Sequence, residues 1–118
     1  MPSRDWRVRI EDILDAVRQI LSYAKGMDST AFAADRKTLD AVIRNLEIIG
    51  EAARHVPDRI SDLYPAVPWQ DMRDMRNLLI HEYFGFDVEV VWQTVATDLA
   101  PLLLLLQVVL DESASGDD

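Results

Sequence analysis

The sequence predicts an all-α protein: an up-and-down bundle of four main helices with one short extra helical turn. Two observations lead to this prediction. Apolar residues recur every three or four positions along most of the 118 residues, and no segment alternates with the two-residue period of a strand. Gly26, Pro57, Pro65, Pro68 and Gly85 fall between the periodic segments, where a bundle needs its loops.

The first two helices are predicted from their apolar stripes. The first stripe consists of Ile10, Ile13, Leu14, Val17, Ile20, Leu21 and Ala24. The second consists of Leu39, Val42, Ile43, Leu46, Ile49 and Ala53. Between them, Gly26 favours a helix end, and the stretch from Asp28 to Thr30 offers a cap for the next helix.

Prolines mark the next boundaries. Pro57 ends the second helix, and a short helical turn with a loop follows it. Pro68 suits the first turn of a third helix, which Gly85 would end. Asp87 can cap a fourth helix, in which Pro101 predicts a kink. The apolar stripe of that helix is Val91, Val95, Leu99, Leu102, Leu106 and Val109.

Size and composition indicate one domain, residues 1–111, followed by a flexible acidic tail, residues 112–118. The chain has no cysteine, which excludes disulfides and thiolate metal sites. The charged N-terminus lacks the apolar core of a signal peptide. The longest apolar stretch, residues 101–110, is shorter than the about 20 residues that cross a bilayer. We therefore expect a cytoplasmic protein without a membrane partner.

The charge argues against general binding of nucleic acid. Twelve basic and 21 acidic residues give a net charge of −9, and −5 remains without the four acids at the C-terminal end. Such a chain does not attract a phosphate backbone over its whole surface. Any RNA contact must come from a local cluster of arginines, which dimerisation would double.

The third predicted helix carries a second face that core packing does not explain. Met72, Met75, Leu78 and Leu79 form its core face. The opposite face mixes polar and apolar side chains: Trp69, Arg73, Arg76, Asn77, Ile80, His81 and Tyr83. A mixed face of this kind is typical of an interface or a functional site rather than of open solvent.

Four blocks of the sequence, in order, resemble the HepT-like branch of the HEPN superfamily. The most specific block contains Arg, four residues, His, one residue and Tyr, written "RNLLIHEY" from Arg76 to Tyr83. The remaining blocks are "RIEDILDAVRQILSYAKG", "AVIRNLEIIGEAARHVP" and "VVWQTVATDLAPL". Together they cover most of the chain, whereas the Arg-to-His spacing alone would arise often by chance.

The resemblance implies an all-helical homodimer whose motif residues gather in a cleft at the dimer interface. It implies the toxin of a type VII-like toxin–antitoxin pair, acting as a metal-independent endoribonuclease without a cofactor. Carried over, Arg76 and His81 become the catalytic pair, with Asn77 as a supporting polar group. Tyr83 becomes the acceptor of AMP, which a partner nucleotidyltransferase of the MntA kind transfers to silence the toxin.

These residue types suit metal-free RNA cleavage. Histidine titrates near neutrality and serves as general acid or base, so two chains of a dimer would supply both. Arginine offers a permanent charge and a bidentate fork for phosphate oxygens. Arg73, one turn before Arg76, is a candidate phosphate contact, with an ion pair to Asp71 or Asp74 as the alternative.

Other interpretations stay open at this stage. The chain is alternatively a non-catalytic helical module that binds the nucleotidyltransferase and is modified by it, or a scaffold without chemistry. His55 is interpreted as a helix C-terminal histidine that favours the dipole, and no metal site is expected. Glu51 has no defined role, although it could orient an arginine of the site.

Overall fold

The described part of the chain is helical throughout. The computed structural model describes the backbone of residues 2–81 and 88–115 and the side chains of residues 6–75 and 88–113. The elements are α1 (Pro2–Tyr23), α2 (Ser29–Ala34), α3 (Arg36–Arg54), α4 (Asp58–Ser61), α5 (Trp69–His81), α6 (Val88–Gln93), the π-helical turn η1 (Thr94–Asp98) and α7 (Leu99–Ser115). No strand occurs in these ranges, and the predicted all-α class is confirmed.

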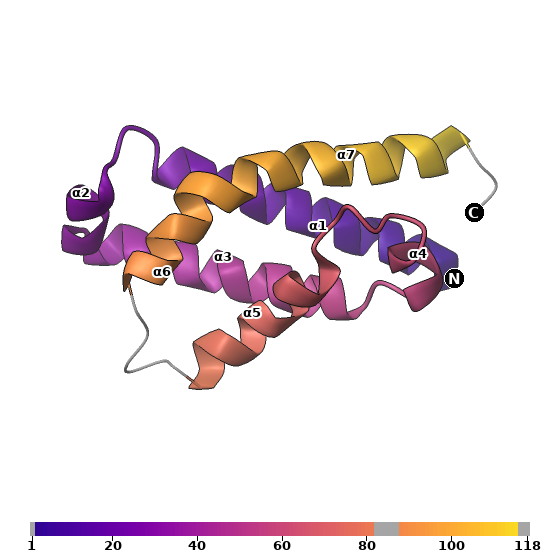
Figure 1. Ribbon diagram of the computed structural model, residues 1–118, viewed down its shortest axis with the longest axis horizontal. Helices are drawn as coiled ribbons and strands as arrows, with labels where there is room; N and C mark the ends of the chain where they lie inside the picture. Colours follow the sequence, from indigo (N-terminus) through magenta and orange to yellow (C-terminus); the bar gives the residue numbers. More distant parts are fainter. Residues whose placement is uncertain (1, 82–87, 116–118) are drawn as a thin grey trace.

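Helices α1 and α3 form the centre of the molecule. Helix α1 packs against α3 and α7, and α3 packs against α5. Figure 1 shows α7 and α5 on opposite sides of this central pair, with α5 turning away from α3 towards its C-terminal end. Within the described residues, α5 and α7 are not among the helix pairs that pack extensively.

The predicted apolar stripes of the first, second and fourth helices form the core. Every residue named for these stripes is buried except Leu21, which is half-buried against the same cluster. Because the stripes recur at three- and four-residue spacing, each helix presents one continuous apolar side to its neighbours. Helix packing therefore confirms the pattern read from the sequence.

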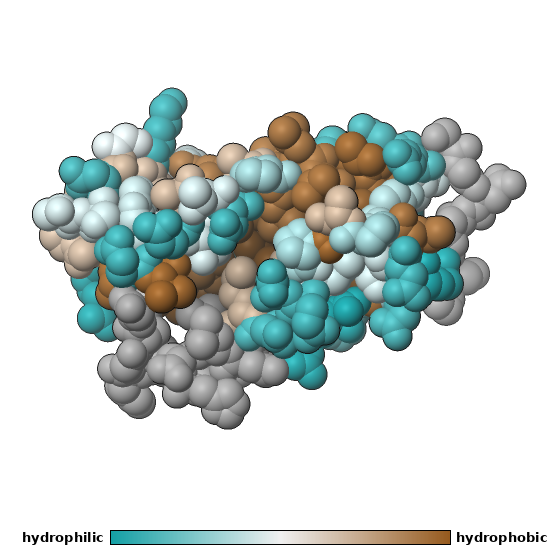
Figure 2. Space-filling model, in the orientation of Figure 1, coloured by the Kyte–Doolittle hydropathy of each residue, from teal (hydrophilic) through white to brown (hydrophobic). Residues whose placement is uncertain are grey.

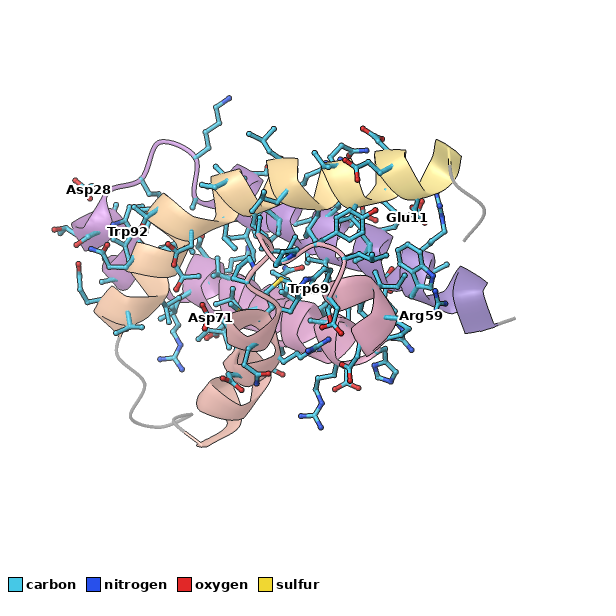
Figure 3. The ribbon with its side chains drawn as sticks, turned by 45° about the vertical axis from the view of Figure 1, so that its right-hand side comes forward. Glu11, Asp28, Arg59, Trp69, Asp71 and Trp92 are labelled. Atoms are coloured by element: carbon cyan, nitrogen blue, oxygen red, sulfur yellow. The ribbon has the colours of Figure 1, made fainter. Side chains whose placement is uncertain are left out.

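The segment between the first two predicted helices contains a short helix that the sequence analysis did not separate. Gly26 adopts φ +80°, which ends α1, and Asp28 caps α2 by accepting a hydrogen bond from the backbone N–H of Ala31 at 2.8 Å. Phe32 of α2 is buried against Trp92 of α6, with ring centroids 5.1 Å apart. Figure 3 shows Asp28 and Trp92 at this end of the molecule.

A second cap starts α3. The Asp35 carboxylate accepts a hydrogen bond from the backbone N–H of Thr38 at 3.1 Å. The hydrogen bonds from Thr38 hold the pKa of Asp35 below its ordinary value, because they favour the charged form. At the other end of α3, Pro57 precedes the short helix α4, which confirms the predicted extra turn.

The predicted fourth helix runs continuously from α6 through η1 into α7. Pro101 has no N–H, so the carbonyl of Thr97 loses its regular helical partner. The π-helical turn lies directly before this position, and Figure 1 shows the helix bending there. The expected kink therefore takes the form of a π-helical turn.

This continuous helix is longer than the apolar stretch that the sequence analysis compared with the thickness of a bilayer. The run Val88–Ser113 has 26 residues and is long and apolar enough to cross a membrane by length and composition, unlike the stretch 101–110 considered from the sequence. Its inner stripe, however, is buried against the rest of the domain, as in a core helix. The outer side of this helix is apolar as well. In the 18-residue window of highest hydropathy, 28% is buried.

The last described turn of α7 is tied to α1. Arg7 Nη1 donates a hydrogen bond to the hydroxyl of Ser113 at 2.7 Å, and Ser113 is buried. The helix continues to Ser115, so residues 112–115 of the expected tail are helical. Residues 116–118 lie outside the described part of the chain.

Replacing a core leucine of α7 should destabilise the fold strongly. Leu106 is 0% exposed, and Leu106→Ala should cost about 2–5 kcal/mol of unfolding free energy, because it removes buried methyl groups and leaves a cavity. The measurement is urea unfolding at constant protein concentration. Leu63, which is 68% exposed, is the control, and Leu63→Ala should stay within about 0.5 kcal/mol. Equal costs for both variants would contradict the assignment of the core.

Candidate functional site

Helix α5, which carries the Arg-x4-His spacing, is anchored at its first residue. Trp69 is buried, and its indole Nε1 donates a hydrogen bond to the carbonyl of Tyr64 at 3.0 Å. The sequence analysis placed Trp69 on the mixed face, and the structure corrects this. Trp69 belongs to the buried core cluster, and the loop that precedes the helix runs close to it (Figure 3).

The described part of the core face of α5 agrees with the sequence. Met72 is buried and Met75 is half-buried against the core cluster. The side chains of Leu78 and Leu79, predicted to share this face, lie outside the described residues. The first two turns of α5 are therefore held by packing and by the loop over Trp69.

Arg73 joins α5 to the end of α3. Its Nε donates to the carbonyl of Ala53 at 3.1 Å, and its Nη2 donates to the carbonyl of Val56 at 3.2 Å. Carbonyls at a helix C-terminus lack intrahelical partners and carry partial negative charge, so a guanidinium satisfies them well. The sequence left Arg73 between a phosphate contact and an ion pair with Asp71 or Asp74. These bonds give it a structural role as well, and the phosphate contact stays a prediction.

The other predicted site residues are placed only by their position in the chain. Arg76, Asn77 and His81 belong to α5, so position 76 follows Arg73 by one turn, and positions 77 and 81 lie one turn apart. Their side chains lie outside the described residues, and so does the whole of Tyr83. The roles of these four residues remain predictions.

A hollow of ≈ 340 Å³ lies beside Arg73. It is lined by Arg54 at the end of α3, by Val56 and Asp58 before and in α4, and by Gln70, Arg73 and Asp74 on α5. The Asp74 carboxylate accepts a hydrogen bond from the Gln70 side-chain amide at 2.8 Å. Sequence analysis did not select Arg54, and its only signal was a basic residue in the last turn of a helix.

His55 ends α3 as a capping residue. Its ring Nδ1 lies 2.9 Å from the carbonyl oxygen of Glu51 and 3.7 Å from the Glu51 carboxylate. This matches the interpretation of His55 as a helix C-terminal histidine. The role of Glu51 stays undefined, and no three His, Asp or Glu side chains gather as a metal would require within the described residues.

Comparison with known proteins identifies the family of this chain. A family model described as "Ribonuclease HepT-like" matches residues 13–109, which include all of the predicted site residues. The chain belongs to the HepT-like ribonuclease family. This confirms the resemblance to the HEPN superfamily noted from the four sequence blocks.

Named relatives point to the same family. The "Probable ribonuclease HepT" of Thermococcus cleftensis is 45% identical over 93 residues, covering 79% of this chain and 84% of its own. A protein of Methanocaldococcus jannaschii, named provisionally as an RNase, is 42% identical over 95 residues, covering 80% of this chain and 78% of its own. A second such M. jannaschii protein is 36% identical over 109 residues, covering 92% of this chain and all of its own. No solved structure gives a significant match.

Removing the donors of Arg73 should destabilise the fold. Arg73→Met keeps the length of the side chain but removes the charged hydrogen bonds to the carbonyls of Ala53 and Val56, which should cost about 1.5–3 kcal/mol. The measurement is urea unfolding. Arg54, exposed at the same end of α3, is the matched control, and Arg54→Met should change stability by about 0.5 kcal/mol or less. A stable Arg73→Met variant would show that these hydrogen bonds do not anchor α5.

Proposed function

We propose that this chain is a metal-independent endoribonuclease and the toxin of a type VII-like toxin–antitoxin pair. The observation that carries the proposal is the Arg76-x4-His81-x-Tyr83 pattern, which begins on α5 inside the region matched by the ribonuclease family model. The names of the relatives support the reaction class. The acidic composition does not oppose it, because the arginines of α5 can form a local site.

The roles follow from the residue types. In RNA cleavage without a metal, the ribose 2′-hydroxyl loses its proton and attacks the adjacent phosphate, and the leaving 5′-oxygen gains a proton. His81 is the proton-transfer group in this proposal. Arg76 stabilises the additional charge on the phosphate oxygens in the transition state, and Asn77 supports it.

A homodimer completes the site in this proposal. Each chain has one motif histidine, so two copies supply both the general acid and the general base. The exposed apolar surface supports association: on α7, Leu104 is 71% and Val108 46% exposed. Figure 2 shows apolar surface over α7 and between α7 and α5 on the face in view. A surface of this kind is typical of an interface.

Control by a partner is the second part of the proposal. An MntA-like nucleotidyltransferase antitoxin transfers AMP from ATP to the phenol oxygen of Tyr83, with release of pyrophosphate and the phenol proton, and silences the toxin in the cytoplasm. A bulky, charged group two residues after His81 would oppose binding of an RNA phosphate by repulsion. The alternative function, a module that is modified by the partner without cleaving RNA, would need Tyr83 but not His81.

Loss of the motif histidine should abolish cleavage. His81→Ala should lower the rate on single-stranded RNA by about 10²–10⁴-fold, because general acid–base catalysis is removed. Arg76→Ala should lower it by about 10²–10³-fold through loss of charge stabilisation. The measurement is cleavage of a labelled RNA by purified dimer in the presence of EDTA, where wild-type activity should persist.

Two variants outside α5 control this experiment. His55→Ala replaces the other histidine, and Arg44→Ala an exposed arginine of α3; both should cleave as the wild type does. Undiminished cleavage by His81→Ala would refute its assignment. If the wild type also fails to cleave RNA, the interaction module becomes the better interpretation.

Modification should depend on one tyrosine. Co-expression with the partner nucleotidyltransferase should add one or more AMP units to the wild type and none to Tyr83→Phe, as measured by intact mass. Tyr23→Phe is the control, because Tyr23 is 43% exposed but bonds to Gln19 on α1, away from the motif. An unchanged wild-type mass, or AMP on Tyr83→Phe, would contradict the proposed acceptor.

A further inference from the structure

The charges of this chain are divided unevenly along it. All 12 lysines and arginines lie within residues 1–76, whereas eight of the 21 acids lie beyond. The net charge is therefore −1 for residues 1–76 and −8 for residues 77–118. Because α6 and α7 carry no basic residue, the positive charge that would attract a polyanion comes from the arginines of α1, α3, α4 and the first turns of α5.

Two of these arginines, Arg54 and Arg73, line the same hollow, close to the start of the motif. Arg54 stands on the last turn of α3 and shares the ≈ 340 Å³ hollow with Arg73 of α5. Position 76 lies one further turn along α5, a rise of about 4.5 Å. Hydrophilic side chains gather at this end of the molecule, over α3, α4 and the start of α5 (Figure 2).

Arg73 and Arg54 have different contacts in this hollow. The helix end of α3 carries partial negative charge, which would repel an anion. Arg73 offsets that charge through its hydrogen bonds to the carbonyls of Ala53 and Val56. The exposed side chain of Arg54 forms no ion pair or hydrogen bond with the described residues, so its guanidinium remains available to a ligand.

The hollow is also lined by the carboxylates of Asp58 and Asp74, and groups other than Arg54 stabilise each of them. Asp74 accepts a hydrogen bond from Gln70. Asp58 lies in the first turn of α4, where the free N–H groups of a helix start favour a carboxylate. Neither lies within ion-pair distance of Arg54. Arg54 is therefore the group that would meet an incoming anion.

We propose that Arg54 binds a backbone phosphate of the RNA substrate, on the nucleotides that flank the cleaved bond. The inference rests on the proposed ribonuclease function and adds a substrate-binding residue on a different helix from the motif. A guanidinium recognises phosphate oxygens with two parallel hydrogen bonds. Since the phosphate is the same at every nucleotide, Arg54 contributes affinity and position of the strand, not choice of base.

The test measures RNA binding in the absence of cleavage. In a His81→Ala background, binding of a fluorescent single-stranded RNA is followed by anisotropy over a range of salt concentrations. Arg54→Met should weaken binding at low salt and reduce the slope of log K against log salt by about 0.7, which corresponds to one lost phosphate contact. Arg54→Lys, which keeps the charge, should retain most of the slope.

Arg44→Met provides the matched control, since Arg44 is an exposed arginine on the same helix and lines a different hollow. It should leave affinity and slope unchanged. Equal slopes for Arg54→Met and its parent, or equal losses for Arg44→Met and Arg54→Met, would overturn the inference while leaving the cleavage result intact. If the His81→Ala parent binds no RNA and the wild type cleaves none, the proposed function fails, and the phosphate site with it.

Discussion

The attachment of α5 to the end of α3 is the constraint on which the candidate site depends. The guanidinium of Arg73 bonds to the carbonyls of Ala53 in α3 and of Val56 just after it, and the buried indole of Trp69 bonds to the carbonyl of Tyr64 in the loop before α5. The Ala53 and Tyr64 carbonyls also accept backbone hydrogen bonds, so the side chains add a second bond at each of these two acceptors. They fix the first turns of α5, and thereby the direction in which the helix carries the motif away from the central pair α1 and α3 (Figure 1).

The outermost helix, α7, is apolar on both its inner and its outer side. Its inner residues are buried in the core, whereas Leu104 and Val108 are exposed. The outer side buries little apolar area in one copy, although such burial is the main source of stability. In the proposed dimer, a second copy would cover this exposed apolar side. The same association would bring together the two motifs of the proposed composite site.

The charges are divided between two parts of the chain, which is consistent with the different partners proposed for them. The helix from Val88 to Ser113 is acidic and apolar, which suits contact with protein. The arginines lie on α1, α3, α4 and α5, and Arg54 and Arg73 meet where three of these elements converge. An acidic protein can act on RNA in this way, since affinity depends on the local field at the site rather than on the net charge.

The sequence by itself determined the helices, their inner sides and the family, because three- and four-residue periodicity, caps and the Arg-x4-His-x-Tyr spacing are local features. The buried stripes from Ile10 to Ala24 and from Val91 to Val109 show how far that reasoning extends. Trp69, Arg73 and Arg54 show where it ends. Their surroundings come from residues 5 to 20 positions away in the chain, which periodicity along one helix does not encode. Only the packing of α5 on α3 decided that Trp69 is covered, that Arg73 holds a helix end, and that Arg54 shares a hollow with it.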